Sequence, residues 1–262
     1  MSINPTMDKL QSLRFYGMAG AYKDQLQQPD ISSLSFDERL ALLVEREVEE
    51  RENRRLATRL RKAKLKHAAS MEDIDYQHPR GLNRLLLQQL AGDRWIKAKQ
   101  NILIVGPTGT GKTYLACAIA QKACLQGHSV HYTKFARLLP DLVIAKGDGR
   151  YTRYMKELCK YDVLILDDWG MMPMTSDHRR DLLELLDERH DNRSTIVTSQ
   201  YPVKTWHEKI NDDTMADAIL DRLVHNANRI ELVGESMRKL KGQLTQAGNV
   251  DINTAITDEI RG

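Results

Sequence analysis

The sequence predicts an α/β fold, in which a parallel β-sheet lies between helices and a small all-helical domain precedes it. Two patterns predict this fold. After residue 80, five short apolar runs alternate with segments of helix length, which is typical of βαβ units and a parallel sheet. Residues 30–78 contain neither glycine nor proline, and their apolar side chains repeat with helical spacing. The apolar runs are residues 101–105, 129–133, 162–167, 194–199 and 229–233.

Composition excludes several classes of protein. The 262 residues are 41% hydrophobic and 29% charged, which is typical of a globular chain and not of a disordered one. No run approaches the ~18 apolar residues of a membrane span, and the start lacks the pattern of a secretory signal. The 3 cysteines have no metal-ligand spacing, which argues against a zinc finger or a disulfide scaffold. We therefore expect a cytoplasmic protein with no membrane partner.

Changes in pattern along the chain predict four segments. Residues 1–67 are expected to form the helical domain, and their charge is sorted, with acids crowded at 45–52 and only bases among the charged residues of 54–66. A linker is predicted at 68–80, where a His-Pro pair resists helix formation. The alternating strands and helices of 81–241 predict the main domain. The polar, weakly patterned residues 242–262 predict a flexible tail.

A phosphate-binding loop is the strongest motif. The octapeptide GPTGTGKT satisfies GxxxxGK[ST] at every fixed position, follows an apolar run and opens a helical segment, which is the context that the motif requires. Its backbone N–H groups would cradle a polyphosphate, Lys112 would reach the β and γ phosphates, and Thr113 would bind Mg²⁺. A glycine-rich turn without chemistry is the alternative. The predicted nucleotide contacts are Gly106, Pro107, Thr108, Gly109, Thr110, Gly111, Lys112, Thr113 and Tyr114.

Acidic and polar residues end two later apolar runs, where a triphosphate site needs them. Asp167 would hold Mg²⁺, and Asp168 would polarise the attacking water. Because Asp168 is shorter than the glutamate common at such a position, we expect slow hydrolysis. Ser199 and Gln200 are candidates to contact the γ-phosphate or its water, or they mark a simple exit from a strand. Arg222 would clamp a phosphate, including that of a neighbouring subunit, unless it is an ordinary exposed arginine.

Six cations form a stripe along the predicted helix 51–66. At 100° per residue they fall within roughly 140°, opposite Leu56, Leu60 and Ala63. Such a stripe matches a nucleic-acid backbone and carries affinity with little sequence information. The alternatives are a solvated charged face and, less favoured because the apolar face lacks bulky aromatics, a membrane surface. The stripe consists of Arg51, Arg54, Arg55, Arg59, Lys62 and Lys66.

In their order along the chain, these segments resemble the AAA+ ATPases. Within them, the chain resembles the DnaA/DnaC branch of initiators and helicase loaders, and in that branch the IstB-type transposition helper ATPases. The resemblance covers nearly the whole chain and combines a shared core with an N-terminal block that is specific. The sequences that carry it are LRFYGMAGAYKDQLQQPD, LSFDERLALLVEREVEERENRRLATRLRKAKL, GPTGTGKT, LILDDWG, TSQYP and DAILDRLVHNANRIELVGESMR.

The resemblance implies a five-stranded parallel sheet, with ATP and Mg²⁺ bound between the subunits of a homo-oligomer. It implies an ATPase that assembles on double-stranded DNA, bends or wraps it, and recruits and stimulates a transposase. It also implies that Arg222 is an arginine finger and that TSQ is sensor I, a group that contacts the γ-phosphate. The chain departs from the general AAA+ pattern in two ways. Asp168 stands where most AAA+ proteins have a glutamate. No separate helical lid domain follows the core, and Arg238 is the candidate for the sensor II arginine.

Other functions are left open by the core motifs. A DnaC-like replicative helicase loader shares all of them but favours single strands, for which stacking aromatics would be expected on the basic stripe, and there are none. A Ras-type GTPase would need an Asn-Lys-x-Asp motif that the chain lacks, and no acceptor pocket of a small-molecule kinase is identifiable. A nucleotide-gated binding module with negligible turnover is the remaining alternative. We therefore prefer the transposition helper.

Overall fold

The computed structural model describes residues 5–237, and the chain divides into two compact units, residues 1–61 and 62–262. Each unit is described by itself. The predicted tail 242–262 and the candidate Arg238 lie outside the described residues. None of the helices in the described part is long and apolar enough to cross a membrane.

The helix is the only regular secondary structure in the described residues of the first unit, 5–61. The helices are α1 (Pro5–Ser12), α2 (Tyr16–Gln27), the short 3₁₀ helix η1 (Pro29–Ser33) and α3 (Phe36–Ala63), whose last residues belong to the second unit. Ser35 and Glu38 cap the start of α3, because the Ser35 backbone N–H donates to Glu38 Oε2 at 2.7 Å and the Glu38 N–H donates to Ser35 Oγ at 3.3 Å. Helix α2 contacts α3 at Gly17, where a Cβ atom would approach the Arg46 carbonyl oxygen to 2.5 Å.

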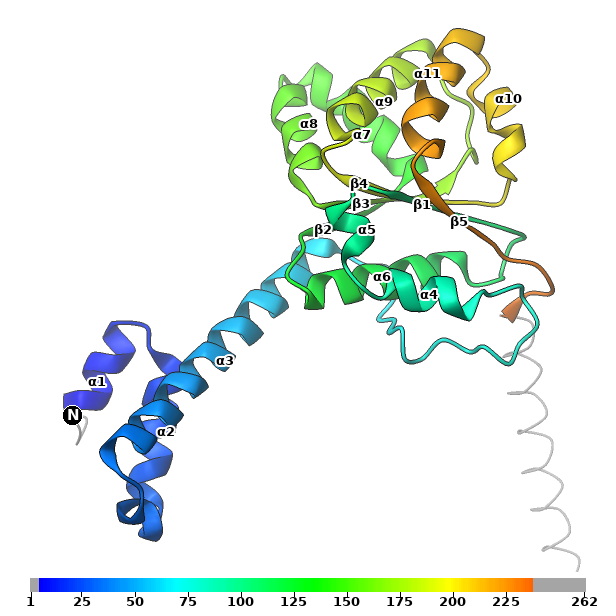
Figure 1. Ribbon diagram of the computed structural model, residues 1–262. Coiled ribbons are helices and arrows are strands. Elements are labelled where there is room, and N and C mark those ends of the chain that lie inside the picture. Colours follow the sequence, from blue (N-terminus) through cyan, green and yellow to red (C-terminus); the bar gives the residue numbers. More distant parts are fainter. Residues whose placement is uncertain (1–4, 238–262) are drawn as a thin grey trace, which may run out of the picture. The chain divides into compact units, whose positions relative to one another are not determined.

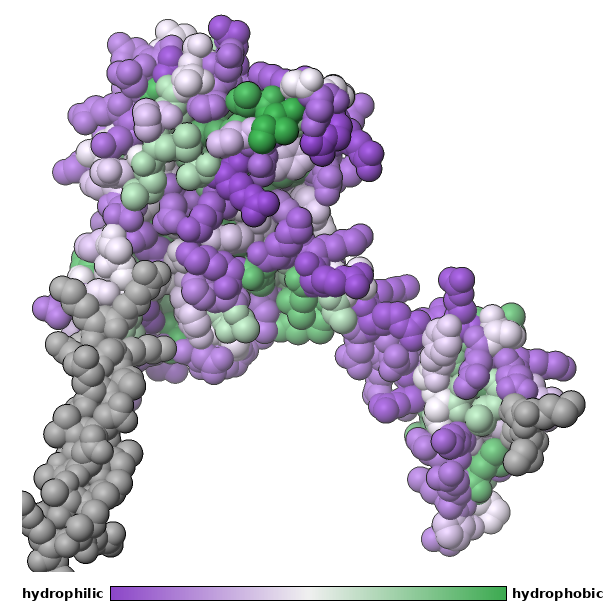
Figure 2. Space-filling view, turned by 180° about the vertical axis from the view of Figure 1, so that it is seen from behind, coloured by the Kyte–Doolittle hydropathy of each residue, from purple (hydrophilic) through white to green (hydrophobic). Residues whose placement is uncertain are grey.

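A carboxylate is buried in the first unit while apolar side chains remain on its surface. Glu47 is 6% exposed and accepts hydrogen bonds from the Met18 N–H at 3.1 Å and from Arg51 Nε at 2.6 Å. By contrast, Val44 and Val48 on the same helix are half exposed, and hydrophobic residues show between hydrophilic ones on this unit in Figure 2. Polar contacts therefore contribute to the packing of α3 on α2.

The second unit is a three-layer α/β/α domain, and the predicted fold class is confirmed (Figure 1). Its parallel sheet has the strand order β2-β3-β4-β1-β5. Helices α4 (Arg84–Leu90), α5 (Arg94–Lys97) and α6 (Lys112–Leu125) cover one face. The other face carries α7 (Phe135–Gly147), α8 (Tyr151–Lys160), α9 (Ser176–Arg189), α10 (Trp206–Ile210) and α11 (Asp213–Val224), with the 3₁₀ turn η2 (Val203–Thr205) before α10.

All five strands lie within three residues of the apolar runs that predict them. They are β1 (Asn101–Val105), β2 (Val130–Lys134), β3 (Val163–Trp169), β4 (Ser194–Ser199) and β5 (Ala227–Glu231). The largest shift is in β5, which starts two residues before the apolar run because Ala227 pairs with Asn101, the first residue of β1. Every residue of β1 and β4 is buried, as expected for central strands covered on both faces.

The predicted linker is packed against the second unit. Ala69, Met71 and Ile74 are at most 8% exposed, and Ala63 at the end of α3 is fully buried. The units meet between residues 61 and 62, several residues before the boundary expected after residue 67. The reason is that small and apolar side chains in this stretch find partners on the domain that follows. We call residues 64–80 the linker segment.

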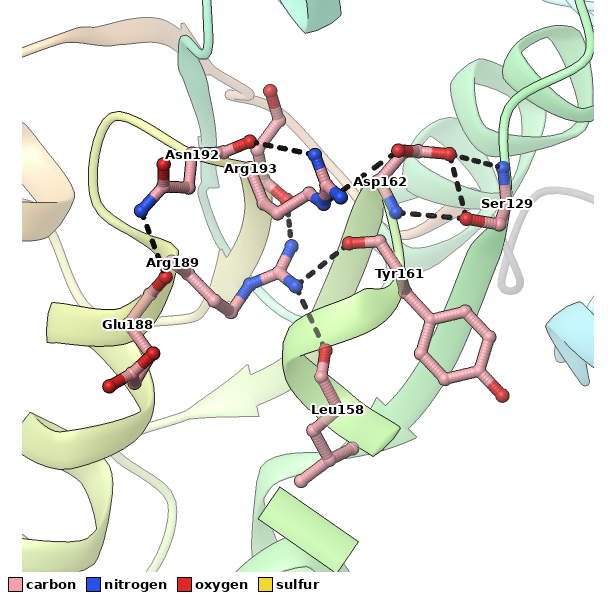
Figure 3. Close-up of polar contacts among 9 residues, drawn as sticks. Ser129, Leu158, Tyr161, Asp162, Glu188, Arg189, Asn192 and Arg193 are labelled. Atoms are coloured by element: carbon pink, nitrogen blue, oxygen red, sulfur yellow. Dashed lines mark hydrogen bonds and ion pairs between the residues drawn. The ribbon is translucent and has the colours of Figure 1, made fainter. Parts of the chain in front are cut away.

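A network of main-chain and side-chain contacts closes the amino-terminal edge of the sheet (Figure 3). The Arg189 side chain is buried, and its Nη1 donates to the carbonyl oxygens of Leu158 and Tyr161, both at 2.9 Å. Next to it, Asp162 Oδ2 accepts from the N–H and the hydroxyl of Ser129 at 2.9 and 2.7 Å. These contacts join the start of β3 to the loop before β2 and the end of α9.

Candidate functional site

The phosphate-binding loop connects β1 to α6. Gly106, Gly109 and Gly111 all have positive φ angles, of 148°, 87° and 96°, which L-residues with side chains rarely adopt. The Thr110 hydroxyl donates to the Pro107 carbonyl oxygen at 2.9 Å, which holds the turn. The loop therefore has the backbone conformation that turns N–H groups toward an anion at the start of α6.

Lys112 extends back over this loop. Its Nζ donates to the carbonyl oxygens of Gly106 and Pro107, each at 2.7 Å, and the residue is 6% exposed. The ammonium therefore sits at the mouth of the loop, where the motif places the lysine that binds the β and γ phosphates.

Thr113 and Asp167 meet beside the loop. Thr113 Oγ1 donates to Asp167 Oδ1 at 2.8 Å, although 54 residues separate them in the chain. Asp167 is fully buried and also accepts hydrogen bonds from Thr198 Oγ1 at 2.6 Å and from the Tyr132 hydroxyl at 2.7 Å. Burial and the hydrogen bond to Asp167 raise the pKa of Tyr132, so its hydroxyl remains a donor. Tyr132 belongs to no motif in the sequence, and Thr198 directly precedes the two polar residues predicted to contact the γ-phosphate or its water.

This oxygen-donor pair fits Mg²⁺. Hard cations prefer hydroxyl and carboxylate oxygens, and Mg²⁺ is usually held by one or two carboxylates together with waters and phosphates. Within residues 5–237, no group of three or more His, Cys, Asp and Glu side chains could hold a metal ion by itself. Thr113 and Asp167 would therefore hold the ion jointly with a phosphate ligand.

Asp168 is aimed into the site by an irregular strand end. Its φ angle is +63°, and the pairing of β3 with β4 shifts register between Leu166 and Trp169. Its N–H donates to Thr198 Oγ1 at 3.1 Å, and its Oδ2 lies 3.8 Å from Lys134 Nζ. A bulge of this kind redirects a side chain, and strained backbone often occurs where a side chain has a chemical task.

The two polar residues predicted at the end of β4 point in different directions. Gln200 lines the cavity next to the phosphate-binding loop. Ser199 is fully buried, and its hydroxyl donates to the Trp169 carbonyl oxygen at 2.9 Å. The alternation of side chains along a strand accounts for the difference and places Thr198, rather than Ser199, at Asp167.

A cavity of about 600 Å³ opens at this edge of the sheet. The predicted nucleotide-binding and catalytic residues that line it are Thr108, Gly109, Gly111, Lys112, Thr113, Tyr114, Asp168 and Gln200. Its size is within the usual range for a small-molecule site. Side chains from other segments line it as well, and these are Lys66, His67, Asp73, Asp75, Arg80, Lys134 and Met237.

Arg80 braces the phosphate-binding loop from the linker segment. It is 5% exposed, and its Nη1 donates to the Thr110 carbonyl oxygen at 3.1 Å while its Nη2 donates to the Asp75 carbonyl oxygen at 2.9 Å. A Cβ atom at Gly111 would approach Arg80 Nη1 to 2.6 Å, so the glycine is required by contact as well as by its φ angle. Arg80 falls in the predicted linker, where no motif in the sequence indicates this role.

Arg222 lies away from the cavity of its own chain. Its carbonyl oxygen accepts from Asn101 Nδ2 at 2.9 Å, at the start of β1, whereas the phosphate-binding loop follows the end of that strand. A five-residue strand is about 13 Å long. The Arg222 side chain is 31% exposed and its Nε lies 2.7 Å from Asp187 Oδ1 of α9.

The six residues of the basic stripe have different surroundings. Arg51 and Arg54 pair with Glu47 and Glu50, and their guanidinium groups lie over the rings of Phe15 and Tyr16, which ties α3 to the start of α2. Arg55 and Lys62 are exposed, and Arg59 is partly exposed. The Nζ of Lys66 lies 4.0 Å from Asp167 Oδ2, next to the cavity.

The fold and the site together define a P-loop nucleotide-binding protein with an AAA+ core. The domain resembles DnaI, with a TM-score of 0.53 and 22% identity over 63% of this chain and 91% of that one. It also resembles the replication initiator DnaA bound to AMPPCP and single-stranded DNA, with a TM-score of 0.54 and 16% identity over 70% of this chain and 56% of that one. Identities this low support the fold alone.

Sequence similarity defines the family. The chain belongs to the IstB-like ATP binding proteins, whose family pattern matches residues 8–245. It is 51% identical to the insertion sequence ATP-binding protein y4pL of Sinorhizobium fredii, over 91% of this chain and 98% of the relative. It is 33% identical to the IS21 ATP-binding protein of Pseudomonas aeruginosa, over 95% of this chain and 94% of the relative. The predicted resemblance to IstB-type proteins is confirmed.

Proposed function

We propose that this protein is an ATP-hydrolysing helper of transposition, which assembles on double-stranded DNA in its ATP-bound state and recruits a transposase. The observation that carries the proposal is that Lys112, Thr113, Asp168 and Gln200 line one cavity. Thr113 Oγ1 also donates to the buried carboxylate of Asp167 beside this cavity. Membership of an insertion-sequence family supports the link to transposition.

Hydrolysis of ATP follows from the roles that the geometry supports. Lys112 and the loop backbone bind the β and γ phosphates, and Thr113 and Asp167 hold Mg²⁺, which neutralises developing charge when it is bound. Asp168 accepts the proton of the attacking water, and Gln200 orients that water or the γ-phosphate. The short Asp168 side chain, with Lys134 3.8 Å from it, favours slow turnover.

Arg222 acts on the nucleotide of a neighbouring subunit in this proposal. The backbone of Arg222 contacts the amino-terminal end of β1, whereas its own chain's phosphate loop follows the other end, about 13 Å away. A guanidinium that is one-third exposed on α11 is available to a second copy of the chain. The proposed active form is therefore a homo-oligomer with ATP between subunits.

Duplex DNA is bound by the exposed end of the basic stripe. Arg55 and Lys62 are exposed and Arg59 is partly exposed, and these are the members that we assign to phosphate contacts. Such contacts give affinity without sequence selectivity. A helicase loader is less well supported, because the similarity to the DnaC helicase loader is in fold only, whereas the sequence similarity is to insertion-sequence proteins.

Removal of the phosphate lysine tests the nucleotide part of the proposal. Lys112→Ala should reduce ATP binding at least a hundredfold and abolish ATP-dependent assembly on DNA, because the loop loses the charge that binds the β and γ phosphates. Binding of a fluorescent ATP analogue and sedimentation with duplex DNA measure the two effects. Lys122→Ala on the same helix is the matched control. Assembly on DNA that is unchanged in Lys112→Ala would refute the proposal.

Charge reversal on the stripe tests the DNA part. The triple variant Arg55→Glu, Arg59→Glu and Lys62→Glu should weaken binding to unrelated duplexes to a similar degree and reduce the slope of log affinity against log salt by about 3. Nucleotide affinity should stay within a factor of two. The control reverses Lys9, Lys23 and Arg46 of the first unit, which gives the same change in net charge. An equal loss in both variants would show that no defined surface contacts the DNA.

A further inference from the structure

Lys66 is the member of the basic stripe that lies at the metal-binding carboxylate. Its Nζ is 4.0 Å from Asp167 Oδ2, and its side chain lines the nucleotide cavity. Helical periodicity groups Lys66 with DNA-contacting residues, but α3 ends at Ala63 and the chain then turns at Lys64, which has a φ angle of +52°. The turn changes the direction in which Lys66 points.

The main chain around Lys66 is anchored to the helix of the phosphate-binding loop. The centroids of the His67 ring and of the Tyr114 ring on α6 lie 6.3 Å apart. The neighbouring residues Ala63 and Ala69 are buried. The Lys66 side chain is nevertheless 31% exposed. A fixed backbone with a partly exposed side chain allows the ammonium to leave Asp167 without unfolding the segment.

Asp167 has a charge that must be balanced when no metal ion is bound. The carboxylate is fully buried, and a buried charge is costly unless it is paired and hydrogen-bonded. Three hydroxyl groups donate to it, from Thr113, Thr198 and Tyr132, and the Lys66 ammonium faces Oδ2. Lys66 is therefore well placed to balance the charge of Asp167.

We propose that Lys66 is an internal counter-ion that competes with Mg²⁺ for Asp167. A divalent ion bound to Thr113 and Asp167 repels an ammonium at the same carboxylate, so binding of the metal with nucleotide displaces Lys66. The displaced side chain lies three residues beyond the end of α3, the helix that carries the DNA-binding residues proposed above. This inference rests on the proposed nucleotide function and adds a route by which metal loading reaches that helix.

Replacement of Lys66 by a neutral side chain of similar length tests the competition. In Lys66→Met, the Mg²⁺ concentration that half-saturates the protein–ADP complex should fall about tenfold, because the competing charge is gone. Affinity for a fluorescent ADP analogue in EDTA should change less than threefold. Lys66→Arg keeps the charge and should behave like the wild type. Lys64→Met is the matched control, since Lys64 lines a neighbouring cavity but not the nucleotide cavity.

Thermal unfolding gives a second readout that does not depend on hydrolysis. In EDTA, Lys66→Met should melt at a lower temperature than the wild type, because Asp167 loses its counter-ion, and the difference should vanish with saturating Mg²⁺ and ADP. If Lys66→Met needed the same or a higher Mg²⁺ concentration for half-saturation, the proposed competition would be refuted, but the proposed nucleotide function would not. If the wild-type protein bound no nucleotide, the proposed function would fail and the inference with it.

Discussion

The two ends of the parallel sheet both bury charged groups, but the cavities beside them differ greatly in volume. At the carboxyl end, Asp167 is fully buried next to a cavity of about 600 Å³. At the amino end, Arg189 is equally buried, and the cavity beside it measures only about 10 Å³. Each nitrogen of the Arg189 guanidinium donates to an oxygen atom of the protein. Burial of a charge is therefore a sign of function only where space remains for a ligand.

The comparison also separates two kinds of polar contact. The Nη1 and Nη2 donors of Arg189 are directed at carbonyl oxygens near chain turns, where they fix the start of β4 and the end of α8 (Figure 3), and its Nε donates to the Thr195 hydroxyl. The Asp167 acceptors receive hydroxyl groups from three different elements, β2, β4 and α6. Hydroxyl groups can rotate to serve a metal ion or a phosphate, whereas carbonyl oxygens in a turn are fixed. We therefore assign stability to the amino end and chemistry to the carboxyl end.

Arg222 is an exception to this assignment of stability to the amino end and chemistry to the carboxyl end, because it lies at the amino end and we propose a role for it in catalysis. Arg222→Ala should reduce ATP hydrolysis in the DNA-bound assembly by about 10³-fold or more, as expected for an arginine finger that acts on a neighbour. ATP affinity of the isolated chain should be unchanged. Steady-state phosphate release and nucleotide titration measure the two quantities.

The ion pair of Arg222 with Asp187 provides the control for that experiment. Asp187→Asn removes the same contact within the chain but keeps the guanidinium. It should retain hydrolysis within a factor of three. Equal losses of activity in both variants would assign Arg222 to the packing of α11 on α9 and leave catalysis at the carboxyl end alone.

Arg189 should show the opposite behaviour. Arg189→Met leaves the carbonyl oxygens of Leu158, Tyr161 and Ser194 without their donor, and the expected loss of unfolding free energy is about 3 kcal/mol. Denaturant unfolding measures this loss. At 10 °C, where the variant should remain folded, it should bind ATP with the same affinity as the wild type. A folded variant that no longer binds ATP would show that the two ends are coupled.

The smallest expected effect concerns Asp162, in the network of Figure 3. Burial raises its pKa, but the N–H and hydroxyl of Ser129 outweigh this and hold the pKa below its usual value. Stability from Asp162 is therefore present above the unfolded-state pKa of about 3.9 and lost as the pH falls through the lower folded-state pKa. Asp162→Asn should be slightly less stable than the wild type at pH 6, and the difference should shrink below pH 4. A difference independent of pH would contradict the assignment.

Much of this protein can be predicted from contiguous sequence. The loop GPTGTGKT, the strand that ends in Asp167 and the alternation of apolar runs with helices are local patterns, and local backbone preferences determine them. They predict the fold class, the order of the strands and helices along the chain and the phosphate-binding loop. The chain's similarity to a known family extended these predictions to a function.

The tertiary structure decided which distant side chains share the cavity. Arg80 and Lys66 reach it from the linker segment, and Tyr132 of β2 donates a hydrogen bond to Asp167 beside it. No spacing in the sequence relates these three residues to Asp167. Helical periodicity grouped Lys66 with the DNA stripe because it assumes that a helix continues, whereas α3 ends at Ala63. The sequence by itself determined the elements and their motifs, since these depend on neighbours along the chain. Only packing determined which side chains lie next to one another, since parallel strands bring together residues that lie tens of positions apart.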